Sequence, residues 1–397
     1  MPTSDVVKLK NTLVDALKAN GELHDPNVEA AFLAIPRHAF LPDMPLEQAY
    51  ANQSVLLKRQ SDGSVISTIS QPSMIAQMLE QLELAPGLNV LEIGTATGYN
   101  AALIAHIVGS EGRVTSVEME SDLIETAARN LQRVQMRASV SIVPGDGAAG
   151  YAPRASYDRI ISTANVYDIP PAWERQLKPA GVLVTPIWLE ALQVSAAFRH
   201  EPGGTFYSEK NLPCWFVHLR GADGMPDLSE RVGSTSLELT SSQIDRIDGA
   251  ALQSFMSDWA EINYFDRPLT WSMLFSGFIP YLTIHLPLEN TMAFYTAPDD
   301  IAPYGVSGTG FALIAQGSAC FIPLDGKGAA HCFGASDAFM TTQQMLTDWV
   351  AAGQPTIDRL RLRLHPRGAL TSVSQGRLFP RKHHDLHAWL EPAIERA

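Results

Sequence analysis

Residues 90–99 read Val-Leu-Glu-Ile-Gly-Thr-Ala-Thr-Gly-Tyr. The apolar start predicts a buried strand, and the glycines predict a tight turn into a helix. Glycine lets the backbone approach a bound ligand without a Cβ clash. The carboxyl end of a strand is also where α/β sheets bind nucleotides. We therefore expect these residues of the turn to contact a ligand: Glu92, Gly94, Thr95, Gly98 and Tyr99.

Acidic residues end the next two predicted strands. Glu118 follows the strand predicted at residues 113–117, where a carboxylate can accept hydrogen bonds from both ribose hydroxyls. Asp146 and Gly147 follow the strand predicted at 140–143, where a carboxylate can accept from an adenine amino group. The loop after residue 93 is uncharged, lacks the G-x-G-x-x-G spacing, and suits a ligand without phosphates. The pattern favours S-adenosyl-L-methionine (SAM) over NAD or a structural remnant of a dinucleotide fold.

The chain divides into two patterns. Strands and helices alternate over residues 1–200, which predicts an α/β, Rossmann-like SAM-dependent methyltransferase domain with a helical N-terminal extension and a polar loop at 58–67. A Pro-Gly-Gly at 202–204 suggests a boundary. Residues 201–397 predict a separate α+β accessory domain, with helices at 249–262 and 336–352 and a half-buried strand at 360–364.

Composition narrows the class of protein. The chain has 397 residues and a net charge of −13, which argues against a nucleic-acid partner. Its three cysteines are too few for a disulfide framework or a four-ligand zinc site, so we expect no metal. The N-terminus has no apolar segment typical of a secretory signal, and no apolar stretch is long enough to span a membrane. We expect a soluble, cytoplasmic protein without a membrane partner.

One further stretch resembles a known family. Residues 68–74 read Thr-Ile-Ser-Gln-Pro-Ser-Met, and with 90–94, 145–147, 157–160 and 176–181 they are similar to protein-L-isoaspartate O-methyltransferases. The resemblance implies SAM as cofactor and a peptide or protein bearing Asp or isoAsp as substrate. It also implies that Ser70 holds the substrate carboxylate, with Thr68 assisting. A second interpretation is that Ser70 caps the helix expected from Pro72.

The reaction that the resemblance implies makes few demands on the enzyme. A carboxylate with a pKa of about 3.9 is already ionised at pH 7 and needs no general base. Catalysis then rests on placing its oxygen in line with the methyl group and on excluding water.

Departures from the family pattern suggest a subgroup. Asn52 and Ala180 stand where the family commonly has Asp and Gly, the 57–64 segment is long, and about 200 residues follow the matched part. These features resemble the enzymes encoded with ribosomal peptide natural products such as lanthipeptides, which methylate an Asp of a modified precursor peptide. This resemblance implies that the accessory domain at 201–397 recognises the peptide substrate. The ester then forms an aspartimide and isoaspartate. Alternatives are a general isoaspartyl repair enzyme with an accessory domain, and a SAM-binding or structural module without catalysis.

Overall fold

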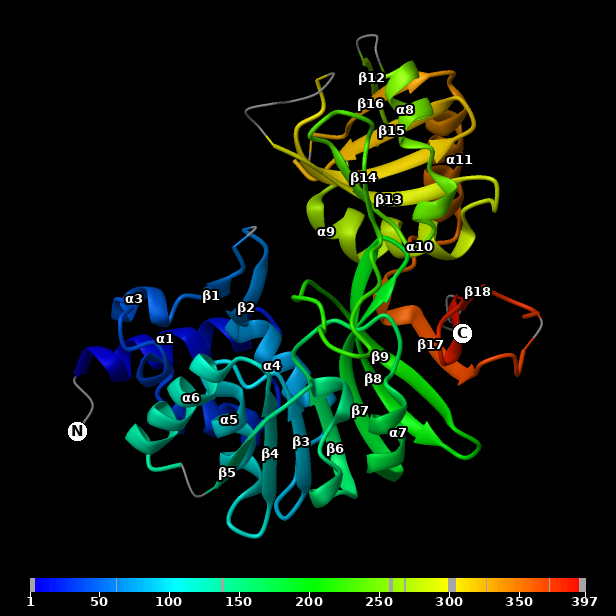
Figure 1. Ribbon diagram of the computed structural model, residues 1–397. Helices are drawn as coiled ribbons and strands as arrows, with labels where there is room; N and C mark the ends of the chain where they lie inside the picture. Colours follow the sequence, from blue (N-terminus) through cyan, green and yellow to red (C-terminus); the bar gives the residue numbers. More distant parts are fainter. Residues whose placement is uncertain are drawn as a thin grey trace, which may run out of the picture.

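A central sheet runs through the larger lobe of the computed structural model (Figure 1). The structure describes residues 4–61, 63–136, 139–256, 260–267, 269–298, 305–325, 327–370 and 372–392. Within these ranges the sheet has ten strands, which lie side by side in this order: β5 (Val140–Pro144), β4 (Arg113–Glu118), β3 (Asn89–Ile93), β6 (Tyr157–Ser162), β7 (Leu177–Leu189), β8 (Leu192–Glu201), β9 (Thr205–Cys214), β17 (Leu360–Pro366), β19 (His384–Leu390) and β18 (Arg377–Pro380).

The strands from β5 to β7 are parallel, as the alternating pattern predicts. Val90 and Leu91 point to opposite faces of β3 and both are fully buried, so both faces are covered. The covering helices are α4 (Pro72–Gln81), α5 (Tyr99–Val108), α6 (Ser121–Arg133) and α7 (Pro171–Gln176). Short 3₁₀ turns, η2 (Gly147–Ala149) and η3 (Ala152–Arg154), follow β5. The predicted Rossmann-like α/β fold is confirmed.

The N-terminal extension is helical, as predicted, and it ends in a hairpin. Its helices are α1 (Ser4–Ala19), α2 (Pro26–Ala34), the 3₁₀ turn η1 (Arg37–Phe40) and α3 (Leu46–Ala49). The prediction of a polar loop over residues 58–67 is wrong, because strands β1 (Val55–Arg59) and β2 (Val65–Ile69) pair antiparallel there. In Figure 1 this hairpin rises from the larger lobe beside the gap between the two lobes.

The sheet does not end at residue 200. That residue lies inside β8, and Gly203 and Gly204, with φ of 84° and 74°, turn the chain back into β9. Strands β17, β18 and β19, from the far end of the sequence, then extend the sheet antiparallel beyond β9. The predicted division into 1–200 and 201–397 therefore does not coincide with a break in the fold.

The smaller lobe holds a second, antiparallel sheet. In the described residues it has seven strands: β10 (Ser229–Arg231), β11 (Glu238–Thr240), β13 (Thr291–Ala297), β14 (Gly308–Ala315), β15 (Ser318–Pro323), β16 (Ala329–Gly334) and β12 (Glu261–Tyr264). Its other elements are η4 (Ile244–Arg246), α8 (Gly249–Phe255), α9 (Trp271–Met273), the π-helical turn η5 (Leu274–Phe278), α10 (Ile279–His285), α11 (Asp337–Ala351) and η8 (Ile357–Arg359).

Three of the expected C-terminal elements have clear outcomes. The helix at 336–352 is confirmed as α11, and the strand at 360–364 is confirmed as β17, in which alternate residues are buried. The helix at 249–262 ends early: α8 stops at Phe255, residues 257–259 lie outside the described residues, and 261–264 form β12. No helix in the described part of the chain combines the length and the apolar character needed to cross a bilayer.

A buried glutamine ties the helical layer to the antiparallel half of the central sheet. Gln81, at the end of α4, donates from Nε2 to the carbonyls of Ser195 in β8 (3.0 Å) and Lys210 in β9 (2.8 Å). Its Oε1 accepts from the Ser195 hydroxyl at 2.7 Å. The amide thus satisfies polar groups that would otherwise be buried without partners.

Replacing this side chain tests the contact. Gln81→Ala removes three hydrogen bonds from a buried site, so it should lower the free energy of unfolding by about 2–3 kcal/mol in urea titrations. Gln77→Ala is the matched control, because Gln77 lies on the same helix and makes no side-chain hydrogen bond among the described residues. Equal stabilities of the two variants would contradict this account of Gln81.

Candidate functional site

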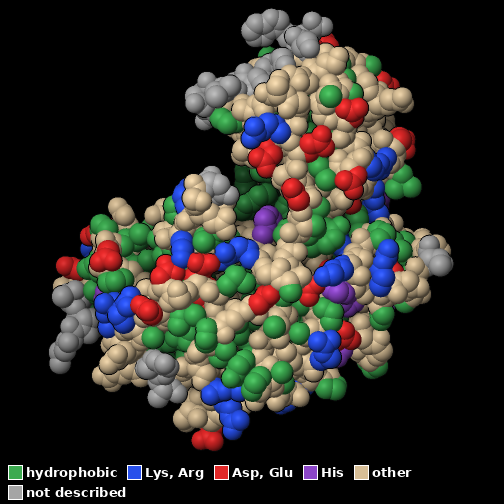
Figure 2. Space-filling model, viewed as in Figure 1, with side chains coloured by type: hydrophobic (Ala, Val, Ile, Leu, Met, Phe, Trp, Pro, Cys, Tyr) green, Lys and Arg blue, Asp and Glu red, His purple; other side chains and the backbone are tan. Residues whose placement is uncertain are grey.

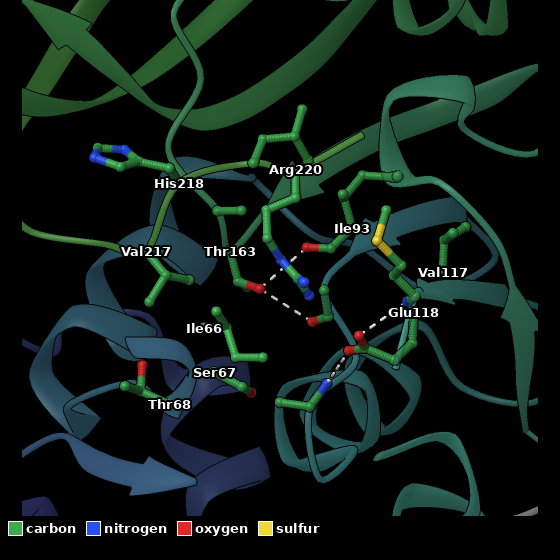
Figure 3. A pocket seen from close by; sticks show the side chains of 16 residues that line it. Ile66, Ser67, Thr68, Ile93, Val117, Glu118, Thr163, Val217, His218 and Arg220 are labelled. Carbon is green, nitrogen blue, oxygen red and sulfur yellow. Dashed lines mark hydrogen bonds between the residues drawn. The ribbon is translucent and has the colours of Figure 1, made fainter. Parts of the chain in front are cut away.

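Two adjoining cavities open at the carboxyl ends of the parallel strands. The first encloses about 580 Å³ and is lined by the ends of β3 and β4, by β2, and by residues 163–164 and 217–220 (Figure 3). The second encloses about 440 Å³ and lies toward α4 and α5. They share Thr68, Gly94, Ala96 and Thr163, so groups bound in each can meet.

The loop after β3 approaches the loop after β6 closely at Gly94. Gly94 has a φ of 92°, and a Cβ there would lie 2.4 Å from Thr163 Oγ1. Thr163 shares its hydroxyl hydrogen between the carbonyls of Ile93 and Gly94, each at 3.0 Å (Figure 3). Only glycine fits this position. Gly98, with a φ of 89°, then begins α5 as its N-cap.

Glu118 lies at the floor of the first cavity. Its Oε2 accepts from the Ala96 N–H at 2.9 Å, and its Oε1 accepts from the N–H groups of Met119 (2.9 Å) and Glu120 (3.1 Å). Figure 3 shows the carboxylate held between the loop and its own strand. Oε1 already accepts two hydrogen bonds, whereas Oε2 accepts one and keeps a site for a ligand hydroxyl such as that of a ribose.

Asp146 and Gly147 are adjacent in the sequence but line different cavities. Gly147 lines the first cavity, and a Cβ on it would lie 2.5 Å from Ile93 Cγ2. Asp146 faces a different hollow, where Oδ1 accepts from Ala148 N–H (2.9 Å) and Oδ2 from Ala222 N–H (2.8 Å). The predicted hydrogen bond from adenine to Asp146 is therefore not supported by its placement. The carboxylate instead holds the loop at residue 222 against the end of β5.

Glu92 supports the glycine loop from behind and does not reach the ligand space. It is fully buried, and it is absent from the described residues that line the two cavities. Its carboxylate accepts from Asn100 Nδ2 at 2.8 Å and from the Ser116 hydroxyl. The Thr95 hydroxyl meets that of Ser116 at 2.6 Å, and Thr95 itself lines the second cavity. The placement of Glu92 therefore does not support the predicted direct contact with the cofactor, because the side chain packs inward.

Ser70 presents an available hydroxyl to the second cavity. Among the described residues its Oγ has no hydrogen-bond partner, and Thr68 lies in the same wall. The capping interpretation is wrong, because Gln71 is the N-cap of α4. It is Asn52 Oδ1 that accepts the N–H of Ser73 in the first turn, at 3.0 Å.

A buried arginine fixes the backbone of Ser70. Arg37 donates from Nη2 to the Ser70 carbonyl at 3.1 Å and from Nε to the Ala49 carbonyl at 3.0 Å. Its guanidinium lies 5.1 Å from the centroid of the Tyr99 ring, which lines the second cavity. Burial raises the pKa of Tyr99, so the predicted ligand contact at Tyr99 presents a neutral ring. The contact stabilises both sides of the cavity wall.

Sequence reasoning missed a group of ion pairs around Arg220, beside the first cavity. Arg220, which lines it, donates to Glu120 Oε1 at 2.7 Å. Lys58, from the β1–β2 hairpin, contacts Glu120 Oε2 (2.5 Å) and Asp122 Oδ1 (2.6 Å). Glu120 thus joins the β1–β2 hairpin to the segment that carries Arg220. No local motif marks Arg220, which is 100 residues from its partner in the sequence.

Because Glu92 is buried, the free energy of unfolding should depend on pH. Burial raises its pKa from 4.5 to about 7, so the folded state holds a proton that the unfolded chain releases. This stabilisation is complete below about pH 4.5 and is lost as pH rises to about 7. Wild type should therefore lose about 3 kcal/mol across that window relative to Glu92→Gln, measured by chemical denaturation at pH 5 and pH 8. The exposed-site control Glu111→Gln should retain the wild-type slope. If the free energy of unfolding of Glu92→Gln depended on pH as steeply as that of wild type, the assignment of this pH dependence to Glu92 would be wrong.

Comparisons with known proteins agree with this geometry. Residues 8–224, more than half of the chain, match the family model described as protein-L-isoaspartate(D-aspartate) O-methyltransferase. A protein-L-isoaspartate O-methyltransferase of Methanopyrus kandleri is 35% identical over 220 residues, covering 55% of this chain and 95% of that relative. One of Pyrococcus horikoshii is 42% identical over 192 residues, covering 47% and 83%.

A solved structure titled protein-L-isoaspartate O-methyltransferase shares the fold. It aligns over 97% of this chain and 100% of its own, with a TM-score of 0.52 and 22% identity. The family match confirms the resemblance carried by residues 68–74 and 90–94, and SAM is the cofactor. The chain belongs to the protein-L-isoaspartate O-methyltransferase family and is a SAM-dependent methyltransferase.

Proposed function

We propose that the enzyme esterifies the side-chain carboxylate of an Asp or isoAsp residue in a ribosomally made, modified precursor peptide. The ester then closes to an aspartimide, which hydrolyses to isoaspartate. The observation that carries the carboxylate is the available Ser70 hydroxyl beside the Glu118 cavity. A hydroxyl donor suits a carboxylate acceptor, and hydrogen bonds to charged groups are the stronger ones.

We assign SAM to the first cavity and the substrate carboxylate to the second. SAM supplies a methyl group on a positively charged sulfur. Glu118 and the backbone at Gly94 and Gly147 would hold its nucleoside part in the first cavity. In the second cavity, Ser70 would donate to one oxygen of the substrate carboxylate and leave the other oxygen free to accept the methyl group. Thr68 borders both cavities and can assist in positioning.

The chemistry of the second cavity favours this reaction. A carboxylate and a sulfonium become a neutral ester and a neutral thioether, so charge disappears along the reaction path. An apolar surrounding disfavours the separated charges and therefore assists their loss. The cavity wall supplies this surrounding through Ile69, Ile75, Met78 and Ile161. No general base is required, since the carboxylate is already ionised at pH 7.

A modified precursor peptide is the finer part of the proposal. Its support is the lobe that lies beyond residue 224, where the family match ends. The second candidate is a general repair enzyme for isoaspartyl residues in proteins. It is favoured by the structure named as a protein-L-isoaspartate O-methyltransferase that aligns with 97% of this chain, smaller lobe included. A module without catalysis fits less well, because Ser70 and Glu118 line adjoining cavities.

Substrate competition separates the candidates. The enzyme is incubated with labelled SAM and an isoaspartyl peptide, its aspartyl counterpart, or a precursor peptide encoded beside its gene. Mass spectrometry should show the precursor gaining one methyl group and then losing methanol. Faster turnover of the plain isoaspartyl peptide would support repair and reject tailoring. Stable label on lysine, a hydroxyl group or a small molecule would reject carboxylate methylation.

Two substitutions should divide catalysis from cofactor binding. Ser70→Ala removes a hydrogen bond to a charged group, so kcat should fall about 10–100-fold with the Kd for SAM unchanged. Glu118→Ala should raise the Kd for SAM at least about tenfold, measured by calorimetry. The exposed Ser54→Ala is the control and should match wild type. A Ser70→Ala enzyme with wild-type kcat would remove Ser70 from the mechanism.

A further inference from the structure

Aromatic side chains connect the smaller lobe to the methyl-transfer site. We call the six rings of Trp271, Phe275, Phe311, Phe294, Trp215 and Trp188 the aromatic path. Within the smaller lobe, the ring centroids of Trp271 and Phe275 lie 5.0 Å apart, those of Phe275 and Phe311 6.1 Å, and those of Phe311 and Phe294 5.6 Å. These separations are typical of contacting aromatic pairs.

The aromatic path then crosses to the central sheet. Phe294 in β13 lies 4.7 Å from Trp215, which follows β9. Trp215 lies 6.3 Å from Trp188 at the end of β7, and Trp188 lies 6.0 Å from the His218 ring. His218 lines the first cavity together with Glu118 (Figure 3). The path therefore ends at the wall of the reaction site.

Two tryptophans of the path are open to solvent. Trp215 is 53% exposed and Trp271 is 55% exposed, and Phe294 between them is partly exposed. Exposed tryptophan is costly in water and marks binding surfaces when several apolar groups adjoin. Helix α9, which contains Trp271, lies on the side of the smaller lobe that faces the β1–β2 hairpin (Figure 1). Figure 2 shows hydrophobic side chains at the back of the hollow between the lobes.

His218 joins this surface to the site without adding charge. Asn165 Nδ2 and His218 Nδ1 lie 3.0 Å apart, within hydrogen-bond distance. The surrounding protein desolvates the ring and lowers the pKa of His218, which keeps it neutral at pH 7. A neutral ring suits a peptide backbone that passes over it, because it adds no charge to this surface.

We infer that the exposed rings of the aromatic path, those of Trp215, Phe294 and Trp271, bind the polypeptide segment next to the reacting residue and select substrates with apolar or aromatic side chains there. The other three rings of the path are buried and support them. The inference rests on the proposed carboxylate methylation. A carboxylate in the second cavity is covalently attached to a chain that must leave past the cavity walls. Trp215 contacts the buried Trp188, whose ring in turn contacts His218 in one of these walls. The exposed ring of Trp215 and the partly exposed ring of Phe294 therefore lie one ring away from the wall and offer such side chains a surface to bury against.

The path also explains what the smaller lobe adds to the catalytic half. The family match ends at residue 224, and four of the six rings lie beyond it. The other two, Trp188 and Trp215, lie within the matched part. The path is therefore formed only when both lobes are present, which gives the smaller lobe a part in selecting the substrate.

Peptide binding to the full-length enzyme tests the inference. Two dye-labelled peptides share a central isoaspartyl residue, flanked on both sides either by Gly and Ser or by Phe and Leu. Their Kd values are measured by fluorescence anisotropy with the enzyme saturated in S-adenosylhomocysteine. Wild type should bind the Phe/Leu peptide about tenfold more tightly. Trp215→Ala and Trp271→Ala should each reduce this preference at least about threefold.

A control variant and the possible outcomes distinguish failure of the inference from failure of the proposed function. Tyr264→Ala removes an aromatic ring that is 68% exposed on β12, an edge strand of the sheet in the smaller lobe, and should keep the wild-type preference. Equal Kd values in wild type, or an unchanged preference in both tryptophan variants, would overturn the inference. So would a change of oligomeric mass in these variants with no change in peptide Kd, since the rings would then bind a second copy. If neither peptide nor a precursor accepts labelled methyl, the proposed function fails, and the inference with it.

Discussion

The close approach of Gly94 to Thr163 is the constraint on which the site depends. One hydroxyl group holds the end of β3 against the end of β6, at a point where any Cβ would collide with it. The chain must then turn away from the sheet, and this turn leaves the space that the cavities occupy. Glu118, at the end of β4, fixes the other side of the turn by accepting a hydrogen bond from the Ala96 N–H. Three neighbouring strands thus determine one loop.

Much of the parallel half could be predicted because its signals are local. The buried run at residues 90–93, the glycines after it and the strand-end carboxylate at Glu118 each depend on a few adjacent residues, and the structure places them as expected. Glu92 and Asp146 differ, because their partners come from other segments. Ser116 and Ala222 decide where those carboxylates point, and a motif contains no information about either.

The architecture beyond residue 200 could be predicted only in part, for a related reason. The alternation at residues 360–364 shows that one face of a strand is buried, but not which strand it pairs with. Pairing with β9 joins positions about 150 residues apart. Pro202, Gly203 and Gly204 favour a tight turn as well as a domain boundary, and here they form the turn between β8 and β9. The same local composition fits a turn between two strands and a boundary between two domains.

The pairing of β17 with β9 has a consequence for synthesis of the chain. Residues up to Cys214 leave the ribosome long before Leu360, so β9 first exists as an open sheet edge. At bacterial or eukaryotic elongation rates this interval is on the order of ten seconds. An unpaired edge is a template for pairing with other chains. The catalytic half therefore spends its first moments with an edge that its own C-terminal strands cover only at the end of translation.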